Sequence, residues 1–206
     1  MCNHNAGARR NTPQGVARGP LMLLCGPSGV GKSSLAVLLG AERPDELTLL
    51  SQDTFFGGGF IPYADALRCG QADMEEPAHI DWLSLREAVR AAQSDGRACL
   101  LEGHMLLTDD ALVEEASLIL FLDAPSKLCA SRRVGRRLRR EAENAEIEEY
   151  YSRFVWPAYD QYVRPVLERL REANRVIVMD ANAPPSDLSH AALIAIDAAL
   201  ARAAER

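Results

Sequence analysis

The chain has 206 residues, of which 48% are hydrophobic and 25% are charged, and its formal net charge at pH 7 is −6. This length suits a single core and is too short for two large domains. The acidic balance argues against a general nucleic-acid-binding protein, and no apolar run approaches the roughly 20 residues that span a bilayer. The N-terminus lacks the apolar segment of a signal peptide, so we expect a cytoplasmic protein.

Residues 1–19 are polar, contain Gly, Pro, Asn and Arg, and show no hydrophobic periodicity. Such a segment has too little apolar surface to offset the entropy lost on ordering. We therefore expect a disordered N-terminal tail, followed by one domain over residues 20–206.

A glycine-rich segment joins the first predicted strand to the first predicted helix. The apolar run Leu21–Leu24 precedes this segment and Leu35–Leu39 follows it, so a buried strand turns directly into a helix. Gly26–Ser33 matches the pattern G-x-x-x-x-G-K-[ST] of a phosphate-binding loop. In such a loop the backbone N–H groups surround phosphate oxygens, and the helix N-terminus adds partial positive charge. The sequence therefore predicts a bound nucleoside triphosphate, against the alternative of a turn that only connects two elements.

The side chains of this loop have defined expected roles. Lys32 reaches the β- and γ-phosphates, and the Ser33 hydroxyl ligates Mg²⁺. ATP and Mg²⁺ are therefore the expected cofactors. The loop residues expected to bind ATP are Gly26, Gly29, Val30, Gly31, Lys32, Ser33 and Ser34.

Apolar and amphipathic segments alternate along the rest of the chain. Strands are predicted at 21–25, 47–51, 98–103, 117–122 and 175–179, and helices at about 32–41, 81–96, 109–115, 145–173 and 187–204. This alternation favours an α/β fold with a five-stranded parallel sheet flanked by helices. The segment from Asp53 to Asp81 fits no regular element, so we expect a long ligand-covering loop there. Pro157 and Pro165 should interrupt or kink the 145–173 helix.

Two acidic residues lie where predicted strands end. Asp53 follows the strand at 47–51, and Glu102 lies near the end of the strand at 98–103. Ligands of open α/β sheets bind at this edge, beside the phosphate loop. The N-K-x-D motif of a GTPase is absent from the sequence. The arrangement therefore favours phosphoryl transfer to a small hydroxyl acceptor over hydrolysis.

The densest charge feature begins at Pro125, where a predicted helix carries six arginines and leads into the acidic segment Glu141–Glu149. Arg132 and Arg136 lie four residues apart, on one helix face. Near a phosphate loop, such a cluster predicts a lid over about residues 126–150 whose guanidinium groups hold the triphosphate and the migrating phosphoryl group. An exposed helix whose arginines pair with the following glutamates is an equally good interpretation.

Several of these segments, in this order, resemble the nicotinamide riboside kinases, which are related to uridine kinases. The similarity runs from about Leu21 to Leu188, and its most specific pieces are Gln52–Phe56 and Val155–Tyr159. Further matching pieces are Leu101-Glu102-Gly103-His104, Pro125 with Cys129 and Arg132-Arg133, and Val178-Met179-Asp180. The resemblance implies a P-loop kinase fold that phosphorylates the 5′-hydroxyl of a ribonucleoside with ATP. Nicotinamide riboside, a precursor in NAD biosynthesis, is the first expected acceptor.

The resemblance also implies roles for individual residues. Asp53 lies beside the acceptor hydroxyl and the metal, where a carboxylate can orient or deprotonate the nucleophile; a turn cap is the alternative. Asp81 holds ribose hydroxyls, or caps a helix, or does both. The resemblance assigns catalysis to Lys32, Asp53 and Arg132, acceptor binding to Asp53, Phe56, Asp81 and Glu102, metal binding to Ser33, Asp53 and Glu102, and ATP binding in the lid to Arg132 and Arg136.

Two positions depart from the family pattern. Family members that prefer nicotinamide riboside hold the base between aromatic side chains, at positions that match Ile80 and Leu138 here. Base stacking contributes roughly 1–3 kcal/mol, which is enough to change the preferred acceptor. Trp82, Phe56 and Tyr63 are candidates to replace the missing rings, but the sequence does not place them.

Other functions therefore stay open at this point. Uridine or another nucleoside is the alternative acceptor, and Pro27 in the phosphate loop is closer to guanylate-kinase-like nucleoside monophosphate kinases. A regulator that binds ATP without transferring phosphate is the alternative outside enzymes. We expect a monomer or homodimer whose partner is a small nucleoside.

Overall fold

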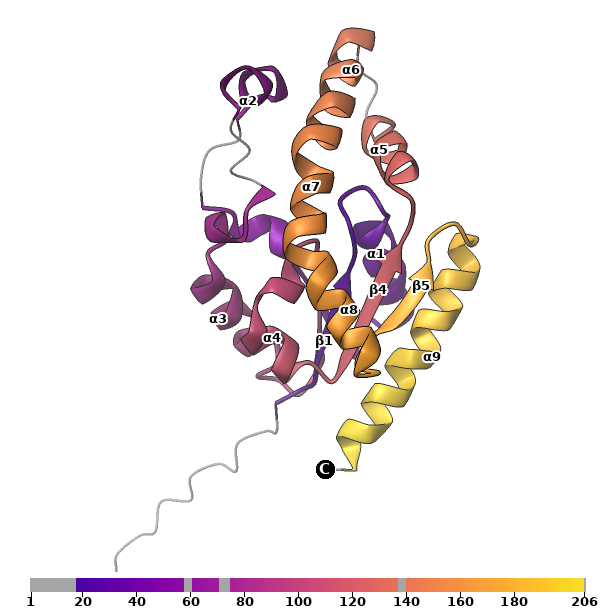
Figure 1. The fold of residues 1–206 in the computed structure, drawn as a ribbon. Coiled ribbons are helices and arrows are strands. Elements are labelled where there is room, and N and C mark those ends of the chain that lie inside the picture. The colour runs from indigo at the N-terminus through magenta and orange to yellow at the C-terminus, as the bar shows by residue number, and fades with distance from the viewer. Residues whose placement is uncertain (1–17, 58–60, 71–74, 137–139, 206) are drawn as a thin grey trace, which may run out of the picture.

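The computed structural model describes residues 18–57, 61–70, 75–136 and 140–205. Its strands are β1 (Leu21–Cys25), β2 (Leu47–Ser51), β3 (Ala98–Gly103), β4 (Leu118–Asp123) and β5 (Ile177–Asp180). They form one parallel sheet in the order β2-β3-β1-β4-β5 (Figure 1). The predicted five-stranded parallel sheet is confirmed.

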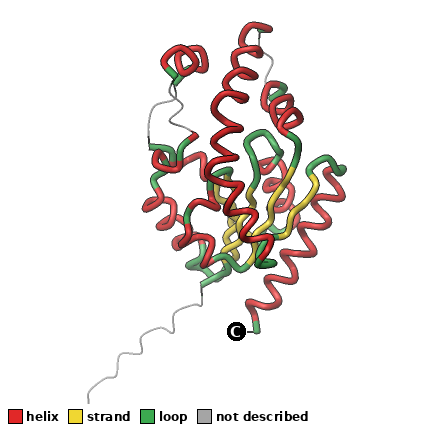
Figure 2. Tube along the Cα trace, viewed as in Figure 1, coloured by secondary structure: helices red, strands yellow, loops and turns green. Residues whose placement is uncertain are grey.

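Helices cover both faces of this sheet (Figure 2). The α-helices are α1 (Lys32–Glu42), α2 (Tyr63–Cys69), α3 (Trp82–Ala92), α4 (Asp110–Glu115), α5 (Ser126–Val134), α6 (Glu141–Tyr150), α7 (Trp156–Ala158), α8 (Arg164–Glu172) and α9 (Pro185–Ala204). Short 3₁₀ segments are η1 (Gln52–Phe55), η3 (Pro77–His79) and η4 (Leu106–Thr108), and π segments are η5 (Tyr151–Val155) and η6 (Tyr159–Val163).

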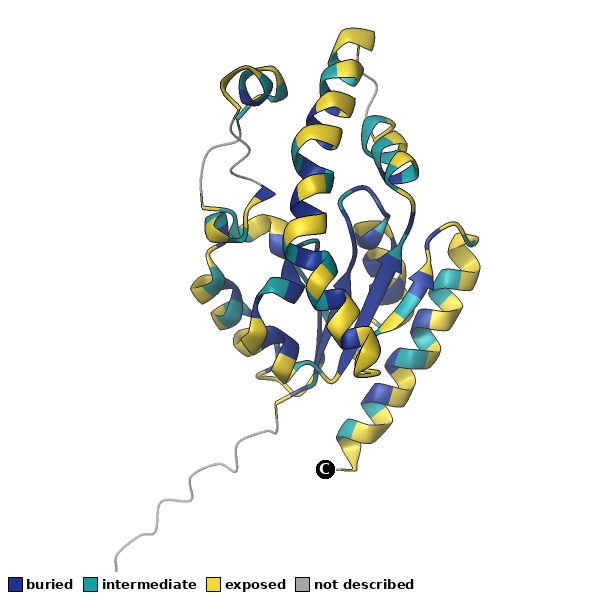
Figure 3. Cartoon of the chain, viewed as in Figure 1, coloured by how far each residue is buried: buried dark blue, intermediate teal, exposed yellow. Residues whose placement is uncertain are grey.

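The central strand β1 separates two hydrophobic clusters. Met22 and Leu24 belong to the cluster with α1 and α9, whereas Leu21 and Leu23 belong to the cluster with α3, α4 and α8. All four side chains are buried (Figure 3). Because both faces of a parallel sheet are covered, its central strand is apolar without alternation. The run Leu-Met-Leu-Leu of β1 follows from this constraint.

The phosphate loop follows β1, the strand at which the strand order of the sheet reverses. Strand β1 pairs with β3 on one side and with β4 on the other. The chain runs from β1 to β2 on one side, and it later crosses from β3 past β1 to β4 on the other, which creates a crevice at the carboxyl ends of the strands. The fold places the loop, Asp53 and Glu102 at this same edge.

The prediction that no regular element lies between Asp53 and Asp81 is wrong. Helix α2 runs over Tyr63–Cys69, and η1 and η3 are further helical turns in this segment. Pro62 precedes the first residue of α2 and Gly70 ends it with a positive φ of 74°. Proline before a helix and glycine after it are ordinary boundary signals. They were hard to recognise here because α2 has only seven residues and no long periodic pattern.

The predicted 145–173 helix is interrupted near both prolines, as expected. Residues 141–172 form one continuous helical rod, but its α turns give way to π turns before each proline (Figure 1). Proline lacks an N–H and crowds the preceding turn of an α-helix. The π segments η5 and η6 directly precede the turns that contain Pro157 and Pro165, and the wider π turn accommodates each ring.

Two sequence expectations fall on residues outside the description. Residues 1–17 of the expected tail and Leu138 of the lid are not among those that the structure describes. Gly19, at the end of the expected tail, is buried, and its N–H and carbonyl are hydrogen-bonded to Gln93 at 3.0 and 2.8 Å. The packed domain therefore includes residue 19.

Helix α1 offers a matched test of this core. Leu39 is fully buried, whereas the adjacent Leu38 is 44% exposed. Leu39→Ala should lower the free energy of unfolding by about 2–5 kcal/mol, because it removes buried methyl groups and leaves a cavity. Leu38→Ala should cost no more than about 1 kcal/mol. Urea denaturation measures both; equal losses would contradict this packing of α1.

Candidate active site

The backbone of the phosphate loop requires glycine at two close approaches. Gly26 and Gly29 have φ angles of 143° and 88°, which side chains rarely allow. A Cβ atom at Gly26 would lie 2.4 Å from the carbonyl oxygen of Leu122, and one at Gly29 would lie 2.2 Å from that of Cys129. Strand β4 and helix α5 therefore pack directly against the loop.

The start of α1 is suited to an anion. Gly31 is the N-cap residue and supplies no side-chain hydrogen bond to the first turn. The N–H groups of that turn have no intrahelical acceptor and carry partial positive charge. Ser33 and Ser34 lie exposed in this turn, and Val30 is buried just before it. The geometry is that of a phosphate site at a helix N-terminus.

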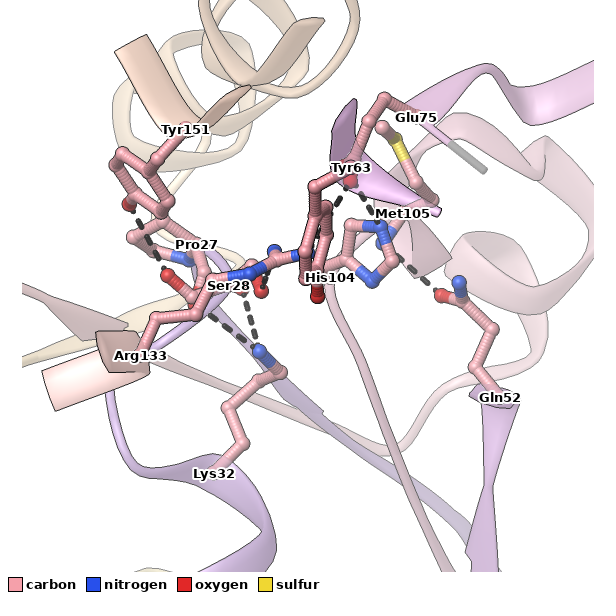
Figure 4. A network of polar contacts seen from close by, with 11 residues as sticks. Pro27, Ser28, Lys32, Gln52, Tyr63, Glu75, His104, Met105, Arg133 and Tyr151 are labelled. Atoms are coloured by element: carbon pink, nitrogen blue, oxygen red, sulfur yellow. Dashed lines mark hydrogen bonds and ion pairs between the residues drawn. The ribbon is translucent and has the colours of Figure 1, made fainter. Parts of the chain in front are cut away.

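Lys32 lies folded inside the loop. Its side chain is buried, and Nζ donates to the carbonyl oxygens of Gly26 at 2.9 Å and Pro27 at 3.1 Å (Figure 4). Burial lowers the pKa of Lys32, while the negative charges of Glu102 and Asp53 oppose this shift. A phosphate entering the loop would add further negative charge and favour the ammonium form.

Glu102 connects three strands at their carboxyl ends. It is 6% exposed, and its Oε1 accepts hydrogen bonds from the hydroxyls of Ser51 at 2.6 Å and Ser33 at 3.1 Å. These residues follow or end β1, β2 and β3, which are neighbours in the sheet. The carboxylate is therefore fixed beside the hydroxyl that was predicted to bind metal.

Asp53 lies in η1, two residues after Ser51, which ends β2. Its side chain is exposed, and its backbone N–H donates to Ser51 Oγ at 3.4 Å. The charge of Asp53 acts on both Lys32 and Glu75, so the carboxylate lies on the phosphate-loop side of the sheet edge. An exposed, orientable carboxylate at this position is available to an incoming hydroxyl.

The oxygen ligands around Ser33 fit Mg²⁺. Among the residues that the structure describes, no group of three or more His, Cys, Asp or Glu side chains could hold a metal alone. Mg²⁺ is usually bound by one or two protein oxygens together with phosphates and waters. The Ser33 hydroxyl, with Glu102 and Asp53 nearby, supplies this kind of partial set. When bound, Mg²⁺ would neutralise charge on the phosphate oxygens.

The two arginines predicted to hold ATP lie in different surroundings, and their role in ATP binding stays a prediction. The guanidinium of Arg132 donates to the carbonyl oxygens of Val30 and Ala181, each at 2.9 Å. It therefore connects the phosphate loop to the segment after β5. Arg136 is exposed, but its charge helps to lower the pKa of Lys32 and His104, so it lies within electrostatic range of the loop.

Arg133 reaches the phosphate loop instead. Its Nη1 donates to Ser28 Oγ at 2.7 Å, and its Nη2 lies 3.5 Å from the Tyr63 hydroxyl and 3.6 Å from Glu75 Oε1 (Figure 4). The side chain is only 15% exposed. Sequence reasoning placed Arg133 beside the predicted pair without a role of its own, because helical spacing alone does not tell which arginine turns inward.

The segment at Ile80 and Asp81, which we call the acceptor segment because Asp81 was predicted to bind the acceptor, pairs with residues that follow β2. Phe56 and Ile80 form an isolated antiparallel bridge, and the Asp81 N–H donates to the Phe55 carbonyl oxygen at 2.8 Å. Phe56 stacks on His104, with ring centroids 5.8 Å apart. Phe56, predicted to contact the acceptor, is therefore held beside the carboxyl end of β3.

Asp81 caps α3, as one of its two interpretations required. Its carboxylate accepts from the Ser84 backbone N–H at 3.0 Å and from the Ser84 hydroxyl at 2.7 Å, and these bonds lower its pKa. Of the aromatic candidates for base stacking, Trp82 donates its indole N–H to the Pro77 carbonyl oxygen at 2.9 Å. Tyr63 lies against Arg133. Both rings have structural partners.

Two buried titratable residues in this region were not predicted. Glu75 is 4% exposed, and burial raises its pKa to about 7 despite Arg133. Burial, together with Lys32 and Arg133, lowers the pKa of His104 to about 3. His104 is therefore neutral, and its 3.8 Å contact with Glu75 is not an ion pair. His104 belongs to a sequence piece that resembles the kinase family, but only the fold brings it to Glu75.

Comparison with curated proteins gives uridine kinases. The chain is 23% identical over 175 residues to the enzyme of Mannheimia succiniciproducens and 26% identical over 178 residues to that of Pasteurella multocida. Each match covers 70% of this chain and 80% of the relative. No protein-family model matches the chain.

Solved structures share the fold. A sugar kinase from a Janibacter species superposes with a TM-score of 0.57 at 23% identity, over 89% of this chain and 97% of that one. A gluconokinase from Sinorhizobium meliloti gives 0.53 at 19% identity, over 91% and 94%. The chain shares the fold of these kinases and is similar in sequence to uridine kinases. Within its described ranges, no helix combines the length and apolarity needed to cross a bilayer.

The chain contains two lysines, which provide a test and its control. Lys32→Ala should weaken MgATP binding by roughly 10–100-fold, because hydrogen bonds to charged groups contribute about 1.5–3 kcal/mol. Lys127 is exposed on α5, so Lys127→Ala should leave the affinity unchanged. Isothermal titration calorimetry measures both. Unchanged binding in Lys32→Ala, with an unaltered melting temperature, would contradict the phosphate-loop assignment.

Proposed function

We propose that this kinase transfers the γ-phosphoryl group of ATP to the 5′-hydroxyl of a ribonucleoside. The observation that carries the proposal is the grouping of a cation and carboxylates at the ends of three adjacent strands. Lys32 and Ser33 follow β1, Asp53 follows β2 and Glu102 lies in β3. Phosphoryl transfer requires little covalent chemistry from the protein and depends on such positioning and electrostatics.

Each of these residues then has a role in the transfer. Lys32 would hold the β- and γ-phosphates, while Ser33 and Glu102 would orient the metal that accompanies them. Asp53 would accept a hydrogen bond from the acceptor hydroxyl and align its oxygen with the γ-phosphorus. Its exposure leaves room for a substrate to reach it.

Nicotinamide riboside is the first acceptor that we propose, and uridine is the second. The segments Gln52–Phe56 and Val155–Tyr159 support the first through their resemblance to nicotinamide riboside kinases. The curated uridine kinases that match the chain support the second. Ile80 is buried against the second core cluster and provides no aromatic surface for a base, so Phe56 is the available ring beside the acceptor segment.

A panel of acceptors tests the reaction and the acceptor together. Purified protein with MgATP is offered nicotinamide riboside, uridine, cytidine, uridine monophosphate and gluconate, and the products are identified by mass. We expect a nucleoside monophosphate from one of the nucleosides. Phosphorylation of uridine monophosphate alone would indicate a nucleoside monophosphate kinase, and phosphorylation of gluconate alone would indicate a sugar-acid kinase. ATP binding without any product would indicate a regulator.

The role of Asp53 gives a separate prediction. Asp53→Asn should lower kcat by at least about 100-fold, because it removes the charge that orients or deprotonates the acceptor hydroxyl. Binding of MgATP should stay nearly unchanged. Asp45 is exposed in the turn before β2, so Asp45→Asn is the matched control. Near-normal turnover of Asp53→Asn in a steady-state assay would remove this role.

A further inference from the structure

Arg133 is held in a fixed position at the mouth of the phosphate loop. Its guanidinium carbon lies 5.8 Å from the ring centroids of both Tyr63 and Tyr150. One end of the guanidinium donates to Ser28 Oγ, and the other faces Glu75. Helices α2 and α6 supply the two rings, and Figure 4 shows Tyr63 beside Arg133.

Ser28 marks where a terminal phosphate would lie. Lys32 Nζ is bonded to the carbonyl oxygens of Gly26 and Pro27, the two residues that precede Ser28. A phosphate-loop lysine contacts the β- and γ-phosphates. The hydroxyl that binds Arg133 is therefore next to the phosphate end of the loop, and a nucleotide γ-phosphate would meet the guanidinium there.

Glu75 is the acidic partner of this arginine. Its Oε1 lies 3.6 Å from Arg133 Nη2, and Tyr150 shares a side-chain hydrogen bond with it. Glu75 lies just before η3, on the segment that continues to Ile80 and Asp81. The contact therefore links the predicted acceptor segment to a lid arginine that touches the phosphate loop.

Burial of the Glu75 carboxylate lowers the stability of the folded state. A buried carboxylate loses hydration that a single ion pair at this distance does not fully restore. The raised pKa of Glu75 reports this imbalance. A neutral side chain of the same size would satisfy the packing at lower cost, so packing alone does not explain an acid at this position.

We propose that Glu75 is a positioning residue, which holds Arg133 so that its guanidinium meets the γ-phosphate of ATP during transfer. This inference rests on the proposed kinase activity, since it assigns the orientation of one of its cations. Glu75 acts only through Arg133 and contacts neither the nucleotide nor the acceptor.

A double-mutant cycle separates this role from a structural one. Arg133→Gln should lower kcat/KM for ATP by about 100-fold, as for loss of one donor to a developing charge. Glu75→Gln should lower it by about 10-fold, as for loss of a residue that orients another. The double variant should be no slower than Arg133→Gln alone, because the two residues act in one path. Additive losses would overturn the proposal.

The pH dependence provides a second readout. The titratable and charged groups that act on Glu75 are Arg133 of α5, Tyr150 of α6, Tyr151 of η5, His104 after β3 and Asp53 of η1. Because its pKa in the fold is about 7, Glu75 should ionise as pH rises from 6 to 8. The wild-type kcat/KM for ATP should rise over this interval, and Glu75→Gln should lose that part of the rise. An identical pH profile in the variant would overturn the proposal.

Stability should change in the opposite direction. A carboxyl group whose pKa is raised in the fold makes the protein less stable as pH rises from its unfolded value of 4.5 to about 7. Glu75→Gln has no such charge, so its melting temperature should exceed that of the wild type at pH 8, and the difference should shrink at pH 5. A variant that is slower because it is less stable at pH 8 would contradict the proposal.

Two controls separate the test of Glu75 from the question of which acceptor is phosphorylated. Glu76 is exposed beside Glu75, and Glu76→Gln should behave as the wild type. The cycle is also read as the ratio of ATP to ADP affinities by calorimetry, which needs no acceptor. If no acceptor is phosphorylated, the proposed function fails; a several-fold lower ATP preference in Glu75→Gln would still support the positioning of Arg133. An unchanged preference would overturn it.

Discussion

The shape of the phosphate loop depends on side chains that bind its carbonyl oxygens from outside. The Tyr151 hydroxyl donates to the Ser28 carbonyl oxygen at 3.0 Å, and Arg132 donates to that of Val30. These two hydrogen bonds fix the loop backbone on either side of Gly29, next to the helix N-terminus where an anion would bind. The donors come from α5 and from the π segment η5, so both elements are attached to the loop.

This attachment gives the arginine-rich segment two functions that charge counting could not separate. Arg132 serves the loop's backbone, while Arg133, the next residue along α5, faces the space above Ser28. Adjacent positions on a helix point about 100° apart, so one turn supplies both an anchor for the loop backbone and a second arginine that faces Ser28.

The sequence was sufficient where a single local constraint determines the structure. The apolar run of β1 and the glycine pattern after it predict a buried strand, a phosphate loop and a helix, and the strand ends carrying Asp53 and Glu102 follow from the parallel topology. Asp81 as the N-cap of α3 also follows from local chemistry. The site residues among these remain predictions until substrates are tested.

What the sequence could not show are contacts between distant segments. Glu75 and Arg133 are separated by 58 positions, and neither spacing nor charge distinguishes Glu75 from its exposed neighbour Glu76. The choice between Arg132 and Arg133 depends on the rotation of α5 against the sheet. Helix α2 and the π segments before Pro157 and Pro165 were missed because short or irregular helical segments carry little periodicity.

The buried titratable groups of the site share one electrostatic property. Burial shifts the pKa of Lys32 and His104 downward and that of Glu75 upward, so each shift favours the neutral form. Charges held in a region of low dielectric interact strongly with an entering polyanion, because little water screens them and little reorganisation is needed. An ATP molecule would restore favourable surroundings for the lysine and for Arg133 at once. The cationic side chains near the phosphate loop would therefore gain favourable interactions when a nucleotide binds. Nucleotide binding should stabilise the folded chain.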